Sequence, residues 1–168
     1  KLKLFNILMI KLFMSCLTFL CRKQISWENT KPFVPNIKMA KVIKVYDGDT
    51  ITVAAKIHPL ICEYYRFSVR LAHIDCPEIK TKDENEKNLA KKAQNKLEDL
   101  ILNQYIELNI ITTDKYGRLL AEIKYNNKSI NDWMLKNKMA VSYDGKKKST
   151  VNWASYYQEN KFCEFKDF

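Results

Sequence analysis

The regularly patterned part of the chain begins with two runs of β-favouring residues on either side of a turn signal. Residues 42–46 and 50–53 are rich in Val, Ile and Thr, and the pair Asp47-Gly48 lies between them. Asp-Gly between two such runs favours a tight hairpin. Residues 65–71 follow with alternating apolar and polar positions, which indicates a third, half-buried strand. The pattern therefore predicts three strands in succession.

A change of spacing then marks a helix. Leu89, Ala93 and Leu97 recur every four residues, and acidic residues precede them. This single apolar stripe predicts an amphipathic helix, whose dipole favours negative charge at its start. Beyond it, residues 106–110 and 119–125 alternate again and predict a fourth and a fifth strand.

Two shorter helices complete the predicted elements. Ser129 is placed to cap one that contains Trp133, and Thr150 is placed to cap another that contains Ala154. Five strands with a helix between the third and the fourth match the element order of an oligonucleotide-binding-type β-barrel. We therefore expect an α+β fold, with a five-stranded barrel of this type and about three helices.

The first part of the chain lacks this pattern. Residues 4–21 are mostly apolar, but Lys11 interrupts them and Arg22-Lys23 follow at once. A membrane-spanning helix needs about 20 apolar residues with almost no charge. A secretory signal needs a small-residue cleavage site, and the residues around Cys21 form a poor one.

We therefore divide the chain into three parts. Residues 1–23 are a hydrophobic and basic N-terminal segment, residues 24–38 are an extended linker with two prolines, and residues 39–168 are the globular domain. The length of 168 residues suits one domain.

Several roles for the N-terminal segment stay open at this point. If translation begins at Met14, Cys16 and Cys21 beside two basic residues are candidates for acylation, which would give a marginal membrane anchor. A signal peptide, an untranslated stretch and a tail without a role are the alternatives. We favour membrane association over secretion, and a soluble intracellular protein is not excluded.

Composition and net charge exclude only a few classes of function. The chain carries 29 Lys and Arg against 19 Asp and Glu, a net charge of +10, and 46% of it is hydrophobic. The first 38 residues hold much of the excess, so the globular part is only mildly basic; this permits a nucleic-acid partner without requiring one. The chain has an odd number of cysteines, five, and only two histidines. These counts argue against a disulfide framework, a zinc site or a Ser-His-Asp triad.

Acidic and basic residues gather in the predicted turns and at strand ends. They occur in Asp47-Gly48-Asp49-Thr50, at Arg70, in Asp75-Cys76-Pro77-Glu78 and in Asp114-Lys115-Tyr116-Gly117-Arg118. Turn formation explains the glycines but not the crowding of carboxylates and arginines. Surface ion pairs of the two arginines with neighbouring acids would be a purely structural explanation.

Three segments resemble the staphylococcal nuclease (thermonuclease) family of calcium-dependent phosphodiesterases. They are residues 42–50 (VIKVYDGDT), 70–78 (RLAHIDCPE) and 113–118 (TDKYGR), in the family's order and with comparable spacing. The resemblance covers roughly residues 40–145. It implies a barrel of the type expected above and a monomeric, Ca²⁺-dependent endonuclease that hydrolyses phosphodiester bonds of DNA and/or RNA.

The resemblance also implies roles for individual residues. Asp49 and Asp75 would be carboxylate ligands of one Ca²⁺, and the backbone carbonyl of Cys76 would be a third ligand, at a position where the family usually has Thr. Arg70 and Arg118 would hold the scissile phosphate.

Further positions would serve the water and the nucleotide. By the same resemblance, Glu78 would orient or deprotonate the attacking water. Lys115, Tyr116 and Tyr143 would contact a terminal phosphate or the nucleotide, and the Tyr143 match requires a one-residue gap.

Elementary chemistry agrees with these roles. Oxygen ligands suit a hard divalent cation, and guanidinium groups grip phosphate in a bidentate manner. Contacts to phosphate carry no base information, so low sequence specificity follows. Two alternatives remain: a non-catalytic barrel that binds nucleic acid or protein, with or without a membrane tether, and a membrane-associated scaffold that rests on residues 4–23 alone. All five matching acidic and arginine positions are filled, which favours the enzyme.

Overall fold

The computed structural model describes residues 25–60, 62–145, 151–153 and 155–156. The chain divides into two compact units, residues 1–33 and residues 34–168. The predictions for residues 1–23 fall outside the described part and stay predictions. Within the described part, no helix is both long enough and apolar enough to cross a membrane.

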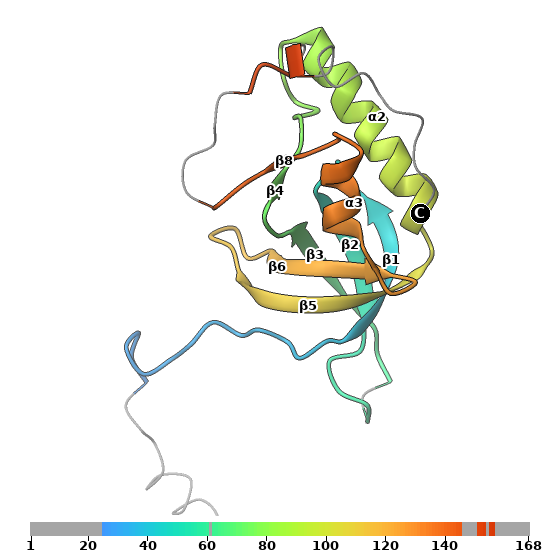
Figure 1. Cartoon of the computed structure of the whole chain (residues 1–168). Helices are drawn as coiled ribbons and strands as arrows, with labels where there is room; N and C mark the ends of the chain where they lie inside the picture. The colour runs from blue at the N-terminus through green and yellow to red at the C-terminus, as the bar shows by residue number, and fades with distance from the viewer. Residues whose placement is uncertain (1–24, 61, 146–150, 154, 157–168) are drawn as a thin grey trace, which may run out of the picture. The chain divides into compact units, whose positions relative to one another are not determined.

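The second unit is built around a five-stranded mixed barrel (Figure 1). Neighbouring strands in the order β3-β2-β1-β5-β6 are antiparallel, and a parallel pairing of β3 with β6 closes the barrel. Its strands are β1 (Met39–Val45), β2 (Thr50–Ala55), β3 (Tyr65–Leu71), β5 (Tyr105–Thr113) and β6 (Leu119–Tyr125). The predicted five-stranded oligonucleotide-binding-type barrel is therefore confirmed.

The predicted hairpin forms at the start of the barrel. β1 and β2 pair antiparallel, and the Tyr46 amide donates to the Thr50 carbonyl at 2.9 Å to close the turn. Gly48 is required in this turn by close approach: a Cβ there would lie 2.9 Å from the Cys76 sulfur and 3.2 Å from Ala93.

A second, two-stranded sheet brings the C-terminal part of the domain against the first half. β4 (Ile74–Asp75) pairs antiparallel with β8 (Val141–Ser142). His73, with a φ of 62°, turns the chain from β3 into β4, and its carbonyl accepts a hydrogen bond from the Tyr143 amide at 3.0 Å. This pairing carries Tyr143 next to the end of β3. A short strand β7 (Lys128–Ser129) pairs antiparallel with the end of β6.

The long predicted helix is α2 (Glu84–Ile101), which begins at the N-cap Asp83. Ala93 and Leu97 are buried on its inner face as predicted, but Leu89 is only half-buried. Ala90 takes the buried place one position later, because the helix face turns with 3.6 residues per turn rather than four.

The second predicted helix is α3 (Ile130–Lys136), and the Asp132 amide donates to its N-cap Ser129 Oγ at 3.1 Å. Asn131 is buried and ties this helix to the barrel: its Nδ2 donates to the Ala72 carbonyl at 2.8 Å, and its Oδ1 accepts from the Ile123 amide at 3.0 Å.

The third predicted helix is described only in part. Residues 153 and 155–156 are helical, whereas Thr150 and Ala154 lie outside the described residues. The described elements thus comprise the barrel and two helices longer than one turn.

Candidate active site

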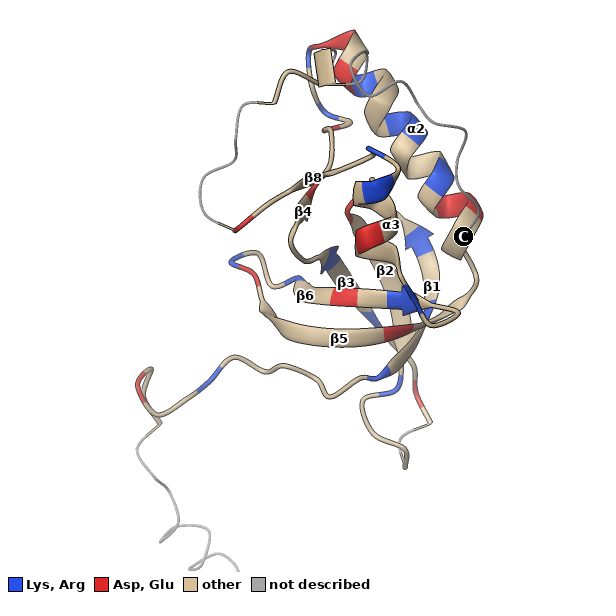
Figure 2. Cartoon of the chain, in the orientation of Figure 1, with Lys and Arg blue, Asp and Glu red and all other residues tan. Residues whose placement is uncertain are grey.

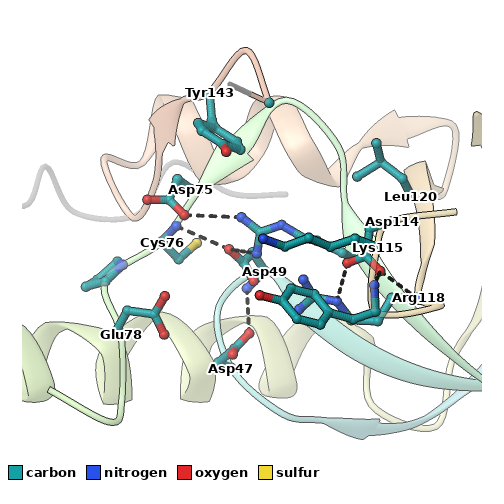
Figure 3. A pocket seen from close by; sticks show the side chains of 14 residues that line it. Asp47, Asp49, Asp75, Cys76, Glu78, Asp114, Lys115, Arg118, Leu120 and Tyr143 are labelled. Atoms are coloured by element: carbon teal, nitrogen blue, oxygen red, sulfur yellow. Dashed lines mark hydrogen bonds and ion pairs between the residues drawn. The ribbon is translucent and has the colours of Figure 1, made fainter. Parts of the chain in front are cut away.

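A cavity of about 730 Å³ opens beside the start of β2 and the end of β3 (Figure 3). It brings together all nine residues that the sequence singled out. They are Asp49, Arg70, Asp75, Cys76, Glu78, Lys115, Tyr116, Arg118 and Tyr143. Their roles remain predictions, but their convergence from four separate stretches of chain is a fact of the fold.

Arg70 bridges the two aspartates that were predicted to be metal ligands. Its Nη1 lies 2.5 Å from Asp49 Oδ2 and its Nη2 lies 3.1 Å from Asp75 Oδ1. Only 5% of Asp49 and 4% of Asp75 are exposed, so both carboxylates meet the same guanidinium inside the protein. Burial by itself lowers the pKa of Arg70, but the charges of Asp49 and Asp75 outweigh it and raise that pKa above its usual value.

Asp49 is held from two further directions. Thr50 Oγ1 donates to Asp49 Oδ1 at 2.9 Å, and the Cys76 amide donates to Asp49 Oδ2 at 3.4 Å. The Cys76 backbone therefore lies beside the carboxylate, while its sulfur faces Gly48. Burial and the charge of Asp49 raise the pKa of the Cys76 thiol well above its usual value, so the thiol stays protonated and packs as an apolar group.

Asp47 adds a third carboxylate to this wall of the cavity. Its Oδ1 accepts a hydrogen bond from the Asp49 amide at 3.2 Å. Burial, together with repulsion from Asp49, raises the pKa of Asp47 to about 6. From the sequence alone this residue had only a turn role, although it stood inside the motif.

The opposite wall is organised by Asp114. Arg118 Nε lies 2.6 Å from Asp114 Oδ2, and the amides of Tyr116 and Arg118 donate to Asp114 Oδ1 at 2.8 and 2.9 Å. Burial alone would raise the pKa of Asp114, but these hydrogen bonds outweigh it and lower that pKa. Gly117, at a φ of 80°, supplies the left-handed turn that this arrangement needs.

Tyr116 lies over the same turn. Its ring centroid is 5.0 Å from Lys115 Nζ and 5.5 Å from Arg118 Cζ. Arg118 Nη1 also donates to Thr50 Oγ1 at 3.3 Å, and that hydroxyl in turn donates to Asp49. Thr50 thus links the Asp49 wall to the Asp114 wall, a role that sequence reasoning missed because it depends on contact across 68 positions.

The two arginine ion pairs that the sequence left as a structural explanation do exist. They lie in the cavity wall rather than on open surface, with 16% of the Arg70 side chain and 27% of the Arg118 side chain exposed. Glu78 is exposed at the cavity rim, and its amide donates to Glu86 Oε1 at 3.1 Å. Figure 3 shows Glu78 on one side of Asp49 and Arg118 on the other.

The side chains that line the cavity are unequally charged. The lining residues include five acidic and three basic side chains, a formal excess of two negative charges. Among the residues that the structure describes, no group of three or more His, Cys, Asp and Glu side chains could hold a metal ion. Two buried carboxylates, those of Asp49 and Asp75, are oxygen donors of the kind that a hard divalent cation prefers, and other oxygens would have to complete its ligand set.

Comparison with known proteins agrees with this geometry. An "Uncharacterized endonuclease" of Haemophilus influenzae is 34% identical over 103 residues, which cover 61% of this chain and 51% of that protein. A "Probable endonuclease LCL3" of Phaeosphaeria nodorum is 28% identical over 100 residues, covering 57% of this chain and 34% of that protein. The match thus spans about half and a third of these relatives. Residues 68–161 match the family described as "Staphylococcal nuclease homologue", and with more than half of its length inside that match the chain belongs to this family.

Proposed function

We propose that this protein is a Ca²⁺-dependent nuclease that hydrolyses phosphodiester bonds of DNA and/or RNA with low sequence specificity. One observation carries the proposal: Asp49, Asp75, Arg70 and Arg118 line a single cavity, with both carboxylates buried. Membership of the staphylococcal nuclease homologue family and similarity to proteins named endonucleases support it.

In this function Asp49, Asp75 and the Cys76 carbonyl would hold the metal ion. A bound divalent cation polarises a phosphate and offsets the charge that develops on it. It would also balance the formal negative excess of the cavity, which otherwise opposes entry of an anion.

Arg70 and Arg118 bind the scissile phosphate. A guanidinium has five N–H donors, so the hydrogen bonds that orient each group on its carboxylates leave donors for phosphate oxygens. The carboxylates that hold Arg70 and Arg118 lie in the cavity wall, so both guanidinium groups are oriented before the substrate arrives. Donors that are oriented in advance stabilise a transition state most.

Glu78 deprotonates the attacking water. Its exposed position at the cavity rim gives it access to solvent. The water oxygen bonds to phosphorus and the water proton passes to the Glu78 carboxylate. The bond from phosphorus to the sugar oxygen breaks, and that oxygen leaves with the electron pair and takes up a proton from solvent. Lys115, Tyr116 and Tyr143 contact the nucleotide or a terminal phosphate, and none of these contacts requires a particular base.

The test is digestion of mixed-sequence single-stranded DNA and RNA by the full chain, with Ca²⁺ and with a chelator. We expect cleavage with Ca²⁺ only. Arg70→Lys and Arg118→Lys should each lower the rate by about 10²–10³-fold, and Glu78→Gln by about 10²–10⁴-fold.

The matched control is Glu63→Gln, an exposed acid in the loop between β2 and β3, which should keep the parental rate. Equal cleavage with and without chelator would contradict the metal dependence. Retention of nucleic acid without any cleavage would instead favour the non-catalytic binding barrel.

A further inference from the structure

Besides Tyr116 and Tyr143, which line the cavity, a third tyrosine lies next to a cavity residue in the chain. Tyr46 follows β1 directly and precedes Asp47, which lines the cavity. Its side chain is exposed, at 47% of its accessible surface. This ring takes no part in the function proposed above.

The backbone beneath Tyr46 is fixed from two sides. The Tyr46 amide donates to the Thr50 carbonyl at 2.9 Å across the turn. Gln94, from α2, donates through its Nε2 to the Tyr46 carbonyl at 2.9 Å and to the Val45 carbonyl at 3.2 Å. An exposed ring on a pinned backbone costs little conformational entropy when a planar group stacks on it.

Lysines from three different elements gather at this position. Lys44 Nζ, from β1, lies 5.8 Å from the ring centroid, and Lys80 Nζ, from the loop after Glu78, lies 6.0 Å from it. Lys91, from α2, donates at 2.8 Å to the Oε1 of Gln94, the residue that holds the Tyr46 carbonyl. Figure 2 shows basic residues along the middle of α2, between its acidic ends.

We propose that Lys44, Tyr46, Lys80 and Lys91 form a second nucleotide-binding subsite, the Tyr46 platform, which holds a single-stranded part of the substrate beyond the cavity. The proposal rests on the nuclease function. A nucleotide base stacks on the tyrosine ring while the lysines contact the flanking phosphates, the combination that single-strand-binding proteins use.

Charge favours this occupant over an apolar partner. The cavity lining has a formal excess of two negative charges, whereas the lysines of the Tyr46 platform carry three positive charges. Distances of 5.8 and 6.0 Å are at the outer limit of a cation–π contact, so the flexible amines can leave the ring for a phosphate.

The position of the platform sets the path of the strand. Tyr46 directly precedes Asp47, Lys80 follows Glu78 by two positions, and both of these acids line the cavity. A strand with its scissile phosphate in the cavity that leaves it past Asp47 and Glu78 would therefore reach the Tyr46 platform. A base inside a duplex cannot stack on a protein ring, so the platform selects single strands.

The test measures binding separately from cleavage. In the Glu78→Gln protein with Ca²⁺, fluorescence anisotropy gives the affinity for a labelled single strand of about 12 nucleotides, within the range of ~4–16 that one barrel of this type covers, and for a labelled trinucleotide. Tyr46→Ala should weaken binding of the long strand by about 5- to 150-fold, the usual effect of losing one stacked base. The loss should be at least several-fold smaller for the trinucleotide.

Two further variants separate stacking from charge. Tyr46→Trp should retain affinity for the long strand. The triple variant Lys44→Gln, Lys80→Gln, Lys91→Gln should make binding less steeply dependent on salt, because each phosphate that no longer pairs with a lysine lowers the logarithmic slope by about 0.7.

The control is Tyr64→Ala. Tyr64 is 61% exposed and has Lys56 Nζ 5.3 Å from its ring, but it precedes the end of β3 that is remote from Arg70. The Tyr64→Ala variant should bind the long strand as tightly as the parent protein does.

Three outcomes would overturn the platform: equal losses of affinity for the long strand and the trinucleotide, no loss in Tyr46→Ala, or no binding by the parent. If the parent binds and Tyr46→Ala weakens binding, but the wild-type chain cleaves nothing, the nuclease proposal fails and the platform stands.

Discussion

The ionised carboxyl of Asp47 destabilises the folded state, although the same carboxyl accepts a hydrogen bond within the turn. Its pKa lies at about 6 because burial and Asp49 disfavour the charged form. The folded chain therefore binds this proton more tightly than the unfolded chain does. The stability contributed by the protonated group is complete below the usual pKa of 3.8 and is lost as the pH rises through about 6.

Asp47→Asn should consequently stabilise the metal-free protein at neutral pH. The asparagine has no charge to bury, and its Oδ1 still accepts the hydrogen bond from the Asp49 amide. Urea unfolding in chelator should give a gain of about 1–2 kcal/mol above pH ~6.5 that shrinks toward zero near pH ~4. Asp99→Asn, an exposed change on α2, is the control. A gain that does not vary with pH would contradict this explanation.

The elements are held together by a few polar contacts as well as by the apolar core. Asn131 of α3 satisfies the Ala72 carbonyl and the Ile123 amide, two backbone groups of buried residues. The same contact fixes the turn from β3 into β4, and so the approach of Asp75 to Arg70.

Asn131→Ala should therefore be strongly destabilising. Removing the side chain leaves two buried polar groups without its hydrogen bonds, at about 1–3 kcal/mol each, so we expect a loss of about 2–6 kcal/mol in the free energy of unfolding. Lys136→Ala, on the exposed side of the same helix, should change stability by less than ~0.5 kcal/mol. Equal effects of the two substitutions in urea unfolding would show that the Asn131 side chain contributes nothing specific.

The net charge of the domain and the charge of its cavity have opposite signs. The globular part of the chain is mildly basic, whereas acidic side chains outnumber basic ones in the cavity lining. A divalent cation that binds only the folded state stabilises it by mass action, by about 2.7 kcal/mol at one hundred times the dissociation constant. Ca²⁺ should accordingly raise the melting temperature of the parent protein by several degrees.

Asp49→Asn and Asp75→Asn should each abolish most of that rise, because each removes one of the two buried carboxylates. Asp99→Asn should show the parental rise. Differential scanning calorimetry with and without Ca²⁺ measures all four proteins. If Ca²⁺ still raises the melting temperature of both the Asp49→Asn and the Asp75→Asn variant, the assignment of these residues as metal ligands is wrong.

Sequence reasoning succeeded where neighbouring residues decide the outcome. Alternation in β3, the Asp47-Gly48 turn and the Ser129 cap depend on contacts over a few positions, and all three occur as predicted. It was less accurate for the inner face of α2, where Ala90 rather than Leu89 is buried, because a constant four-residue spacing drifts off one face of a helix that has 3.6 residues per turn.

The sequence by itself determined the order of the five barrel strands and of the two helices α2 and α3, the family, and nine of the residues that line the cavity, because local patterns and motifs specify each of these. Only the tertiary structure decided how those residues meet. The parallel pairing of β3 with β6 closes the barrel, Arg70 lies between two carboxylates, and Lys80 lies beside Tyr46. These contacts join positions far apart in the chain, and the free energy that selects them comes from the packing of the complete domain rather than from any short segment.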